Sequence, residues 1–154
     1  MLKKFVSSLV IVTLLAGCSS STASTANAAI DVESTATKIV SDLKLTDKMD
    51  SIESKIVQGL FFFDDGVVTS DSVYIANDKT ADTVGVFETS NVDSCKESIS
   101  TYLKSQKEQM QNYYPDEVFK IDNAIVEDNG SVVILVICND IETAQKEVDS
   151  LLGK

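Results

Sequence analysis

The sequence contains no histidine, no arginine and no tryptophan, and it has only one proline and three cysteines. Without histidine the chain cannot form a Ser-His-Asp or Cys-His catalytic group, or a zinc site built on imidazole. Without arginine it has no guanidinium for a bidentate clamp on phosphate or carboxylate. These absences exclude most ordinary hydrolase and transferase designs. We therefore expect a protein that is not an enzyme and that uses no cofactor or metal.

Basic residues are also scarce. The 154 residues contain 13 basic and 24 acidic side chains, for a formal charge of −11. Two lysines and no acids lie in residues 1–17, so a chain beginning at residue 18 would have 137 residues and a charge of −13. Such a charge repels nucleic-acid phosphates and anionic lipid headgroups. We therefore expect no nucleic-acid partner.

The N-terminus has the pattern of an export signal. Lys3 and Lys4 precede an apolar run over residues 5–15, which is too short for the roughly 20 residues that cross a bilayer. The run ends in Leu15-Ala16-Gly17-Cys18, which looks like a bacterial lipobox, where a peptidase cleaves before a cysteine whose sulfur carries a diacylglyceryl group. We predict a signal peptide over residues 1–17 and lipidation of Cys18. This predicts a protein anchored by lipid to the cell membrane, on its extracytoplasmic face.

Two alternatives fit the N-terminus less well. Ala26-Asn27-Ala28 matches an A-x-A cleavage site but lies far beyond the apolar run. An uncleaved anchor is disfavoured because no basic stop signal follows that run. Residues 18–30 are then the lipidated cysteine and a flexible tether, since residues 19–29 carry no charge and no large apolar side chain.

Residues 31–154 are predicted to form a single globular domain with four helices. The helical spacing of apolar residues covers residues 32–43, 46–59, 91–114 and 140–152. Thr46, Asn91 and Asp140 are candidate N-caps. Gly59 is placed to end the second helix, and Pro115 forbids continuation of the third.

Two β-hairpins complete the predicted domain. Residues 73–75 and 83–87 flank a polar turn, and residues 124–127 and 131–138 flank Asp128-Asn129-Gly130, a sequence that readily takes the positive φ angles of a tight turn. Val132 to Ile137 are all apolar, which predicts a central strand covered on both faces. The predicted fold is α+β, in the order α-α-β-β-α-β-β-α, with about four strands in an antiparallel or mixed sheet and helices packed on it.

Several of these segments carry a family resemblance. VYIANDKTADTVGVF, the long helix, and then YYPDEVFKIDNAIVEDNGSVVILVICND resemble the small lipoproteins of Gram-positive bacteria grouped as domain of unknown function 4358. The resemblance covers roughly residues 58–152 and includes the lipobox and tether; Tyr114-Pro115, the Asn129-Gly130 hairpin and the following strand are its most specific parts. The family brings no assigned activity and no recognised catalytic residue. It therefore supports the fold order and the surface location, and it supplies no site.

Two polar patterns could carry chemistry. Residues 41–44, Ser-Asp-Leu-Lys, match S-x-x-K but lack the S-D-N and K-T-G motifs that accompany it in serine-lysine enzymes, so we expect a solvated helix face. Asp64-Asp65 beside Gly66, and Asp78 near Asp82, could offer oxygens to calcium. Because the EF-hand spacing is absent, solvated turns without metal are expected.

Cys95 and Cys138 remain once Cys18 is lipidated. An exported cysteine pair invites a disulfide. However, Cys95 lies in the first turns of the long helix and Cys138 ends the last strand. If that helix crosses over between parallel strands, the two positions are much too far apart for a bond. We therefore expect two buried thiols.

Aromatic residues are the last clue. Phe61, Phe62 and Phe63 are consecutive, so a strand cannot bury all three on one face, and Tyr113-Tyr114 close the long helix. Core packing explains most of them, and any that remain exposed would form a patch for a peptide, a glycan or a protein.

The expected function is a non-catalytic binding or envelope-assembly lipoprotein, with the membrane and an envelope protein or glycan as partners. The alternative is an enzyme, or an enzyme accessory, that acts on cell-wall material through carboxylates.

Overall fold

The computed structural model describes residues 30–154. The predicted signal peptide (residues 1–17), the lipidation site Cys18 and the tether up to residue 29 lie outside the described residues. The described residues thus correspond to the predicted globular domain and the last residue of the predicted tether.

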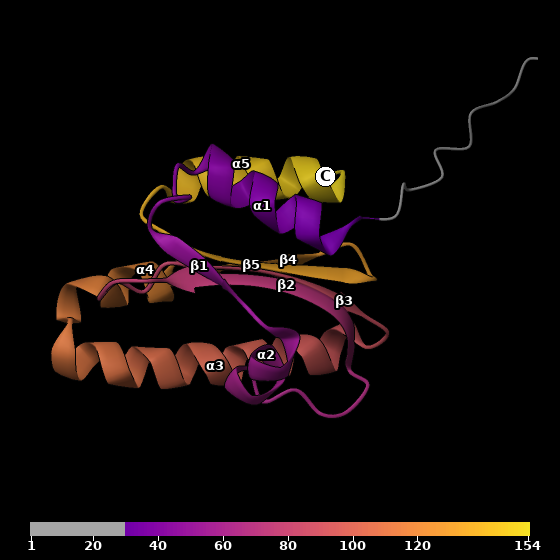
Figure 1. Ribbon diagram of the computed structural model, residues 1–154, viewed down its shortest axis with the longest axis horizontal. Helices are drawn as coiled ribbons and strands as arrows, with labels where there is room; N and C mark the ends of the chain where they lie inside the picture. Colours follow the sequence, from indigo (N-terminus) through magenta and orange to yellow (C-terminus); the bar gives the residue numbers. More distant parts are fainter. Residues whose placement is uncertain (1–29) are drawn as a thin grey trace, which may run out of the picture.

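A five-stranded sheet lies between two layers of helices (Figure 1). The strands are β1 (Met49–Ile52), β2 (Val68–Ala76), β3 (Thr83–Thr89), β4 (Ile125–Asp128) and β5 (Val132–Ile137). The helices are α1 (Val32–Asp42), α2 (Ser54–Leu60), α3 (Val92–Tyr113), α4 (Val118–Asp122) and α5 (Ile141–Leu152), with a 3-10 turn, η1 (Pro115–Glu117), before α4. Helices α1 and α5 cover one face, and α2, α3 and α4 lie on the other. The α+β class is confirmed.

The strand order is β1-β2-β3-β5-β4, and every neighbouring pair is antiparallel. Both predicted hairpins are present, and β5 is the buried strand predicted from its composition, since all six of its residues are buried. Strands β3 and β4 run parallel with β5 between them, so α3 crosses over from one to the other as expected.

The sheet has five strands, whereas the sequence predicts about four. The additional strand is β1, which lies within the predicted helix over residues 46–59. The apolar spacing of Met49, Ile52 and Ile56 suits a helix, yet Met49 to Ile52 pair with the last four residues of β2 and only Ser54–Leu60 are helical. Gly59 lies inside α2 rather than ending it. A four-residue edge strand is specified by its partner, so periodicity within the segment could not reveal it.

Local signals fixed the other elements. Asp31, Asn91 and Asp140 each accept a hydrogen bond from the backbone N–H three residues on, which caps α1, α3 and α5. Gly130 has φ +93° in the β4–β5 turn. Helix α3 ends at Tyr113, two residues before the only proline.

The domain has two cores, one on each face of the sheet. The aliphatic layer, between the sheet and α1 and α5, contains buried residues such as Ile39, Val86 and Ile134 and no buried aromatic ring. The aromatic layer, between the sheet and α2, α3 and α4, contains four clustered rings: Phe61, Phe63, Phe87 and Tyr102. Alternate residues of β5 supply both layers, as a strand of period two must when both faces are covered.

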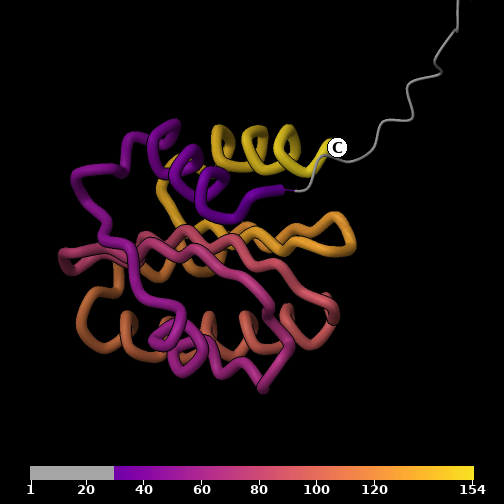
Figure 2. Tube along the Cα trace, turned by 45° about the vertical axis from the view of Figure 1, so that its right-hand side comes forward, coloured from indigo at the N-terminus to yellow at the C-terminus, as the bar shows by residue number. Residues whose placement is uncertain are grey.

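The two ends of the sheet differ in what they carry. The start of the described chain, just before α1, lies near the C-terminus, at the end where α1 starts and α5 finishes (Figure 2). The β2–β3 turn, α4 and the last turn of α3 lie at the opposite end. Among the described helices, none combines the length and apolar character needed to span a bilayer.

Candidate functional site

The two inner cysteines are buried free thiols, as predicted. Cys95 lies in the aromatic layer beyond the end of β3, whereas Cys138 lies in the aliphatic layer, after the residue that pairs with the start of β3. They are thus on opposite faces and at opposite ends of the sheet. Burial raises the pKa of Cys95 to about 12 and that of Cys138 to about 11, so neither supplies a thiolate nucleophile near neutral pH.

The S-x-x-K pattern falls at the exposed end of α1. Ser41 belongs to the helix, and Lys44 follows it with φ 57°, joined to Ser41 only through a backbone hydrogen bond of 3.0 Å to the Ser41 carbonyl. No hydrogen bond connects the two side chains among the described residues. This arrangement fits the solvated helix face that was expected.

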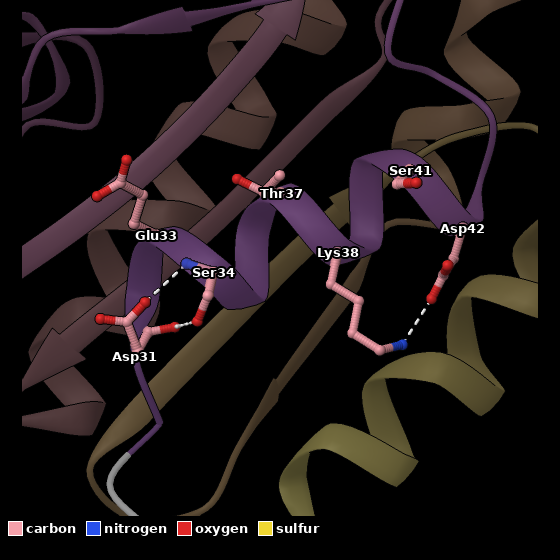
Figure 3. Close-up of a pocket in the computed structure, with 7 residues that line it drawn as sticks. All are labelled: Asp31, Glu33, Ser34, Thr37, Lys38, Ser41 and Asp42. Carbon is pink, nitrogen blue, oxygen red and sulfur yellow. Dashed lines mark hydrogen bonds and ion pairs between the residues drawn. The ribbon is translucent and has the colours of Figure 1, made fainter.

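A hollow of about 570 Å³ runs along the same helix (Figure 3). Its lining in the described part of the chain is seven exposed side chains, all from Asp31 to Asp42 of one helix. Lys38 is already neutralised by Asp42, at 2.6 Å, and by Glu147 of α5. Within residues 30–154 these side chains share one helix face with no opposing wall, so the described lining does not converge on a ligand.

The acidic turns do not assemble a metal site. Asp64 and Asp65 are exposed in the turn before β2, and Asp78 accepts a hydrogen bond of 3.0 Å from the Thr80 amide. Asp82 is buried and bound by a lysine. Residues 30–154 contain no group of three His, Cys, Asp or Glu side chains that could hold a metal ion.

The lysine that binds Asp82 belongs to a buried charge cluster of Asp82, Glu117 and Lys120. The Lys120 Nζ lies 3.1 and 3.2 Å from the two carboxylate oxygens of Asp82 and 2.8 Å from the Oε2 of Glu117. The same Glu117 oxygen accepts a hydrogen bond of 2.8 Å from the Ala81 amide. The cluster therefore joins the β2–β3 turn to η1 and α4.

Electrostatics keep this lysine charged. Burial of Lys120 opposes its charge, but the hydrogen bonds to Glu117 and Asp82 outweigh that effect, so the pKa of Lys120 is raised above its ordinary value. A lysine that acts as a base or forms a Schiff base needs the opposite shift. The buried charge cluster is therefore a cross-link within the fold rather than a reactive centre.

Two small hollows flank Asp82. One, of about 150 Å³, is lined by Leu43, Leu45, Lys48, Asp82, Cys138, Asn139 and Asp140. The other, of about 130 Å³, lies beside Tyr102, whose hydroxyl is 3.2 Å from the Thr83 hydroxyl. Ligand pockets usually have roughly 300–1,000 Å³, so neither hollow encloses more than a very small molecule.

Three exposed aromatic side chains lie on, or directly before, the segment that carries Glu117 and Lys120 of the buried charge cluster. We define the aromatic platform as Tyr113, Tyr114 and Phe119, whose exposed fractions are 75%, 37% and 59%. They lie at the end of α3, before η1 and in α4. The apolar spacing over residues 91–114 follows Val92, Cys95, Ile99, Leu103, Met110 and Tyr113, which predicts that Tyr113 faces the core. This prediction is wrong, because Tyr113 is exposed; Tyr102, which is not in that pattern, is the buried tyrosine of α3.

A second apolar pair lies at α2. Ile56 is 55% exposed, and Phe62 is 56% exposed with φ 58°, an unusual backbone conformation for a bulky residue. Of the three consecutive phenylalanines, only Phe61 is fully buried and Phe63 is partly buried. The expectation that core packing explains most of the five aromatic residues is therefore wrong, because Phe62, Tyr113 and Tyr114 are exposed.

The sequence could signal only part of this site. Asp82 and Tyr113-Tyr114 stood out as an acid and as aromatic residues, but no pattern joined Asp82 to Glu117 and Lys120, which are 35 and 38 positions further along the chain. Nothing in the sequence distinguishes Lys120 from a surface lysine. It is buried because it lies in α4, a helix of five residues that the apolar periodicity does not predict.

Comparison with known proteins gives one match. The family model described as Domain of unknown function (DUF4358) matches residues 41–138, a range that contains the buried charge cluster and the aromatic platform. No curated protein and no solved structure matches the chain.

Proposed function

The chain belongs to the DUF4358 family, and from that premise, which supplies no activity, we propose that it is a membrane-anchored extracytoplasmic lipoprotein that binds an envelope partner without catalysis. Its membrane contact is the lipid on Cys18, and its partner is an envelope protein or glycan. The observation that carries the binding role is the aromatic platform, with three exposed rings beside one buried charge cluster.

The chemistry of the described residues favours binding over catalysis. Both inner thiols are buried with raised pKa values, and the one buried lysine is held in its charged form. Burial also raises the pKa of Asp71 on β2, but Asp71 lines none of the three hollows. Carboxylate catalysis needs a cleft that takes substrate between two acids. The enzyme alternative has no such observation behind it.

The anchor is tested by substitution of the lipidation site. Cys18→Ala should give an unprocessed or released protein that takes up no radiolabelled fatty acid, because Cys95 and Cys138 are buried. Ser19→Ala, the adjacent change that keeps the cysteine, should remain labelled and sediment with membranes. Labelled fatty acid in the Cys18→Ala protein would contradict the anchor.

The binding role is tested in cells that carry the anchored protein. After chemical crosslinking, the wild-type chain should co-purify with a distinct envelope component, and a Tyr113→Ala/Phe119→Ala variant should recover much less of it. Ile56→Ala is the matched control, because Ile56 is equally an exposed apolar residue but lies on α2. If the wild-type chain crosslinks to nothing in the envelope, the proposal of a binding module is wrong.

A further inference from the structure

The aromatic platform already holds a cation from its own chain. The Nζ of Lys79, in the β2–β3 turn, lies 5.9 Å from the centre of the Tyr114 ring, within the range of a cation–π interaction. Tyr113 and Phe119 are more exposed than Tyr114, and the described residues place no lysine over either ring. Two further aromatic rings are therefore open to the same kind of contact.

The segments that carry the platform and Lys79 hold more acidic than basic side chains. Lys107 pairs with Asp122, and Lys120 is enclosed in the buried charge cluster. Asp78, beside Lys79 in the chain, and Asp116, in η1, are exposed and form no ion pair within residues 30–154. Exposed rings on segments that also carry unpaired carboxylates complement a positively charged partner, because the carboxylates attract it and the rings bind it.

The buried charge cluster holds the platform in place. Glu117 accepts a hydrogen bond from the Ala81 amide, and Lys120 donates hydrogen bonds to Asp82. These bonds connect the segment of Tyr114 and Phe119 to the turn of Lys79. A surface fixed before binding loses less conformational freedom when its partner arrives. The cluster therefore preorganises the rings.

The position of the platform argues against the membrane as its occupant. The platform segments, α4 and the end of α3, lie at the end of the domain opposite the start of α1, the element that follows the predicted anchor and tether in the sequence (Figure 1). The net charge of −11 also repels anionic lipid and other polyanions. A partner that approaches from the side away from the anchor would meet the rings first.

We propose that the aromatic platform binds a lysine- or arginine-containing segment of a partner protein, with cationic side chains over Tyr113 and Phe119 and with attraction from the exposed carboxylates of Asp78 and Asp116 on the same segments. This proposal rests on the binding function proposed above and names the chemistry of its partner. Lys79 over Tyr114 is the internal example of the contact that the partner makes.

The test is titration calorimetry of the full chain in neutral detergent micelles with a ten-residue peptide of alternating glycine and lysine. The wild-type chain should bind this peptide with an affinity that falls as salt rises, and it should not bind the matching glycine-glutamate peptide. Tyr113→Leu/Phe119→Leu keeps apolar bulk but removes both rings, so it should weaken binding at least tenfold. Phe62→Leu, an exposed ring on the other apolar pair, should not weaken it.

Two results would overturn the proposal. Equal binding of the lysine peptide to the double leucine variant would show attraction to overall negative charge alone. Binding of chitotetraose at the rings, with no binding of the lysine peptide, would make the platform a glycan surface. The envelope crosslinking experiment tests the binding function separately. If the crosslink is still lost in the Tyr113→Ala/Phe119→Ala variant, the binding function is supported and only the cationic nature of the partner is wrong.

Discussion

The two faces of the sheet are covered by different kinds of side chain, aliphatic on one face and largely aromatic on the other. The aliphatic layer packs valine, isoleucine, leucine and alanine from α1 and α5 onto the sheet, and the outer side of these helices is charged, with Lys38 joining Asp42 to Glu147. The aromatic layer packs Phe61 at 4.1 Å from Tyr102 and 5.2 Å from Phe87, measured between ring centres. Charged side chains therefore cover the outside of the aliphatic layer, whereas the helices of the aromatic layer also expose apolar side chains to solvent.

All of the large apolar side chains that the structure exposes in residues 30–154 belong to the aromatic side. Ile56 and Phe62 lie at α2, and Tyr113, Tyr114 and Phe119 form the platform. Scattered apolar residues need no explanation, but this one-sided distribution does. This one-sided distribution supports the proposal that the aliphatic layer is the scaffold and that the aromatic layer carries the binding surface.

The largest expected effect is the loss of a ring from the aromatic layer. Phe61→Ala should lower the free energy of unfolding by about 3–5 kcal/mol, because Phe61 is fully buried between other rings and its removal leaves a cavity. Urea unfolding followed by circular dichroism measures this. A loss below about 1 kcal/mol would mean that the layer can collapse around the gap, and that it is not the rigid support described here.

The buried charge cluster should respond differently from a surface pair. Lys120→Met should cost about 3 kcal/mol, because it leaves the buried Asp82 and the partly buried Glu117 without their cation. Lys146→Met breaks the exposed pair with Glu142 on α5 and should cost less than about 1 kcal/mol. Equal losses in urea unfolding would remove the distinction between the two sides.

Glycine positions sharpen the contrast on a smaller scale. A Cβ at Gly85 on β3 would lie 2.6 Å from the ring of Phe87, so Gly85→Ala should destabilise the domain by roughly 1–3 kcal/mol. A Cβ at Gly59 in α2 would meet no described atom within 4 Å. Gly59→Ala should therefore stabilise the domain by roughly 0.5–1 kcal/mol, because alanine has the higher helix propensity. A stable Gly85→Ala protein would contradict the tight packing of the aromatic layer.

Sequence patterns predicted what is local. The Asn91 cap, the Asn129-Gly130 turn and the apolar run of β5 each depend on neighbours in the chain, and all three were predicted correctly. Strand β1 was missed because its only support is pairing with β2, and its Met49 and Ile52 have a spacing that a helix shares.

The site was less predictable than the fold. Whether Tyr113 faces the core or solvent depends on where α3 leaves the sheet, which periodicity along the helix cannot tell. The link between Asp82 and Lys120 requires two distant segments to meet. Contacts between distant segments of this kind leave no periodic trace in a single sequence.

The smallest effect concerns Asp71. Burial raises the pKa of this half-buried carboxyl, and its Oδ1 has no hydrogen-bond partner among residues 30–154, so the charged form of Asp71 destabilises the folded state. Because the folded-state pKa lies above the unfolded value, stability from this group increases as the pH falls through the folded pKa. Asp71→Asn should therefore stabilise by roughly 0.5 kcal/mol at neutral pH and by less near pH 3.

The control for this change is Asp65→Asn, an exposed acid in the turn before β2. Thermal unfolding of both variants between neutral and acidic pH measures the difference. If the gain from Asp71→Asn were larger in acid than at neutral pH, the direction assigned to its pKa would be wrong.

Site-specific photo-crosslinking tests most directly whether the aromatic side is the recognition surface. A benzoylphenylalanine can replace Phe119 on the platform or Lys146 on the outer side of α5, both exposed, in the membrane-anchored chain. Irradiation of intact cells should give a defined adduct with an envelope component from position 119 and none from position 146. The same adduct from position 146, with none from position 119, would place recognition on the aliphatic side and contradict the account.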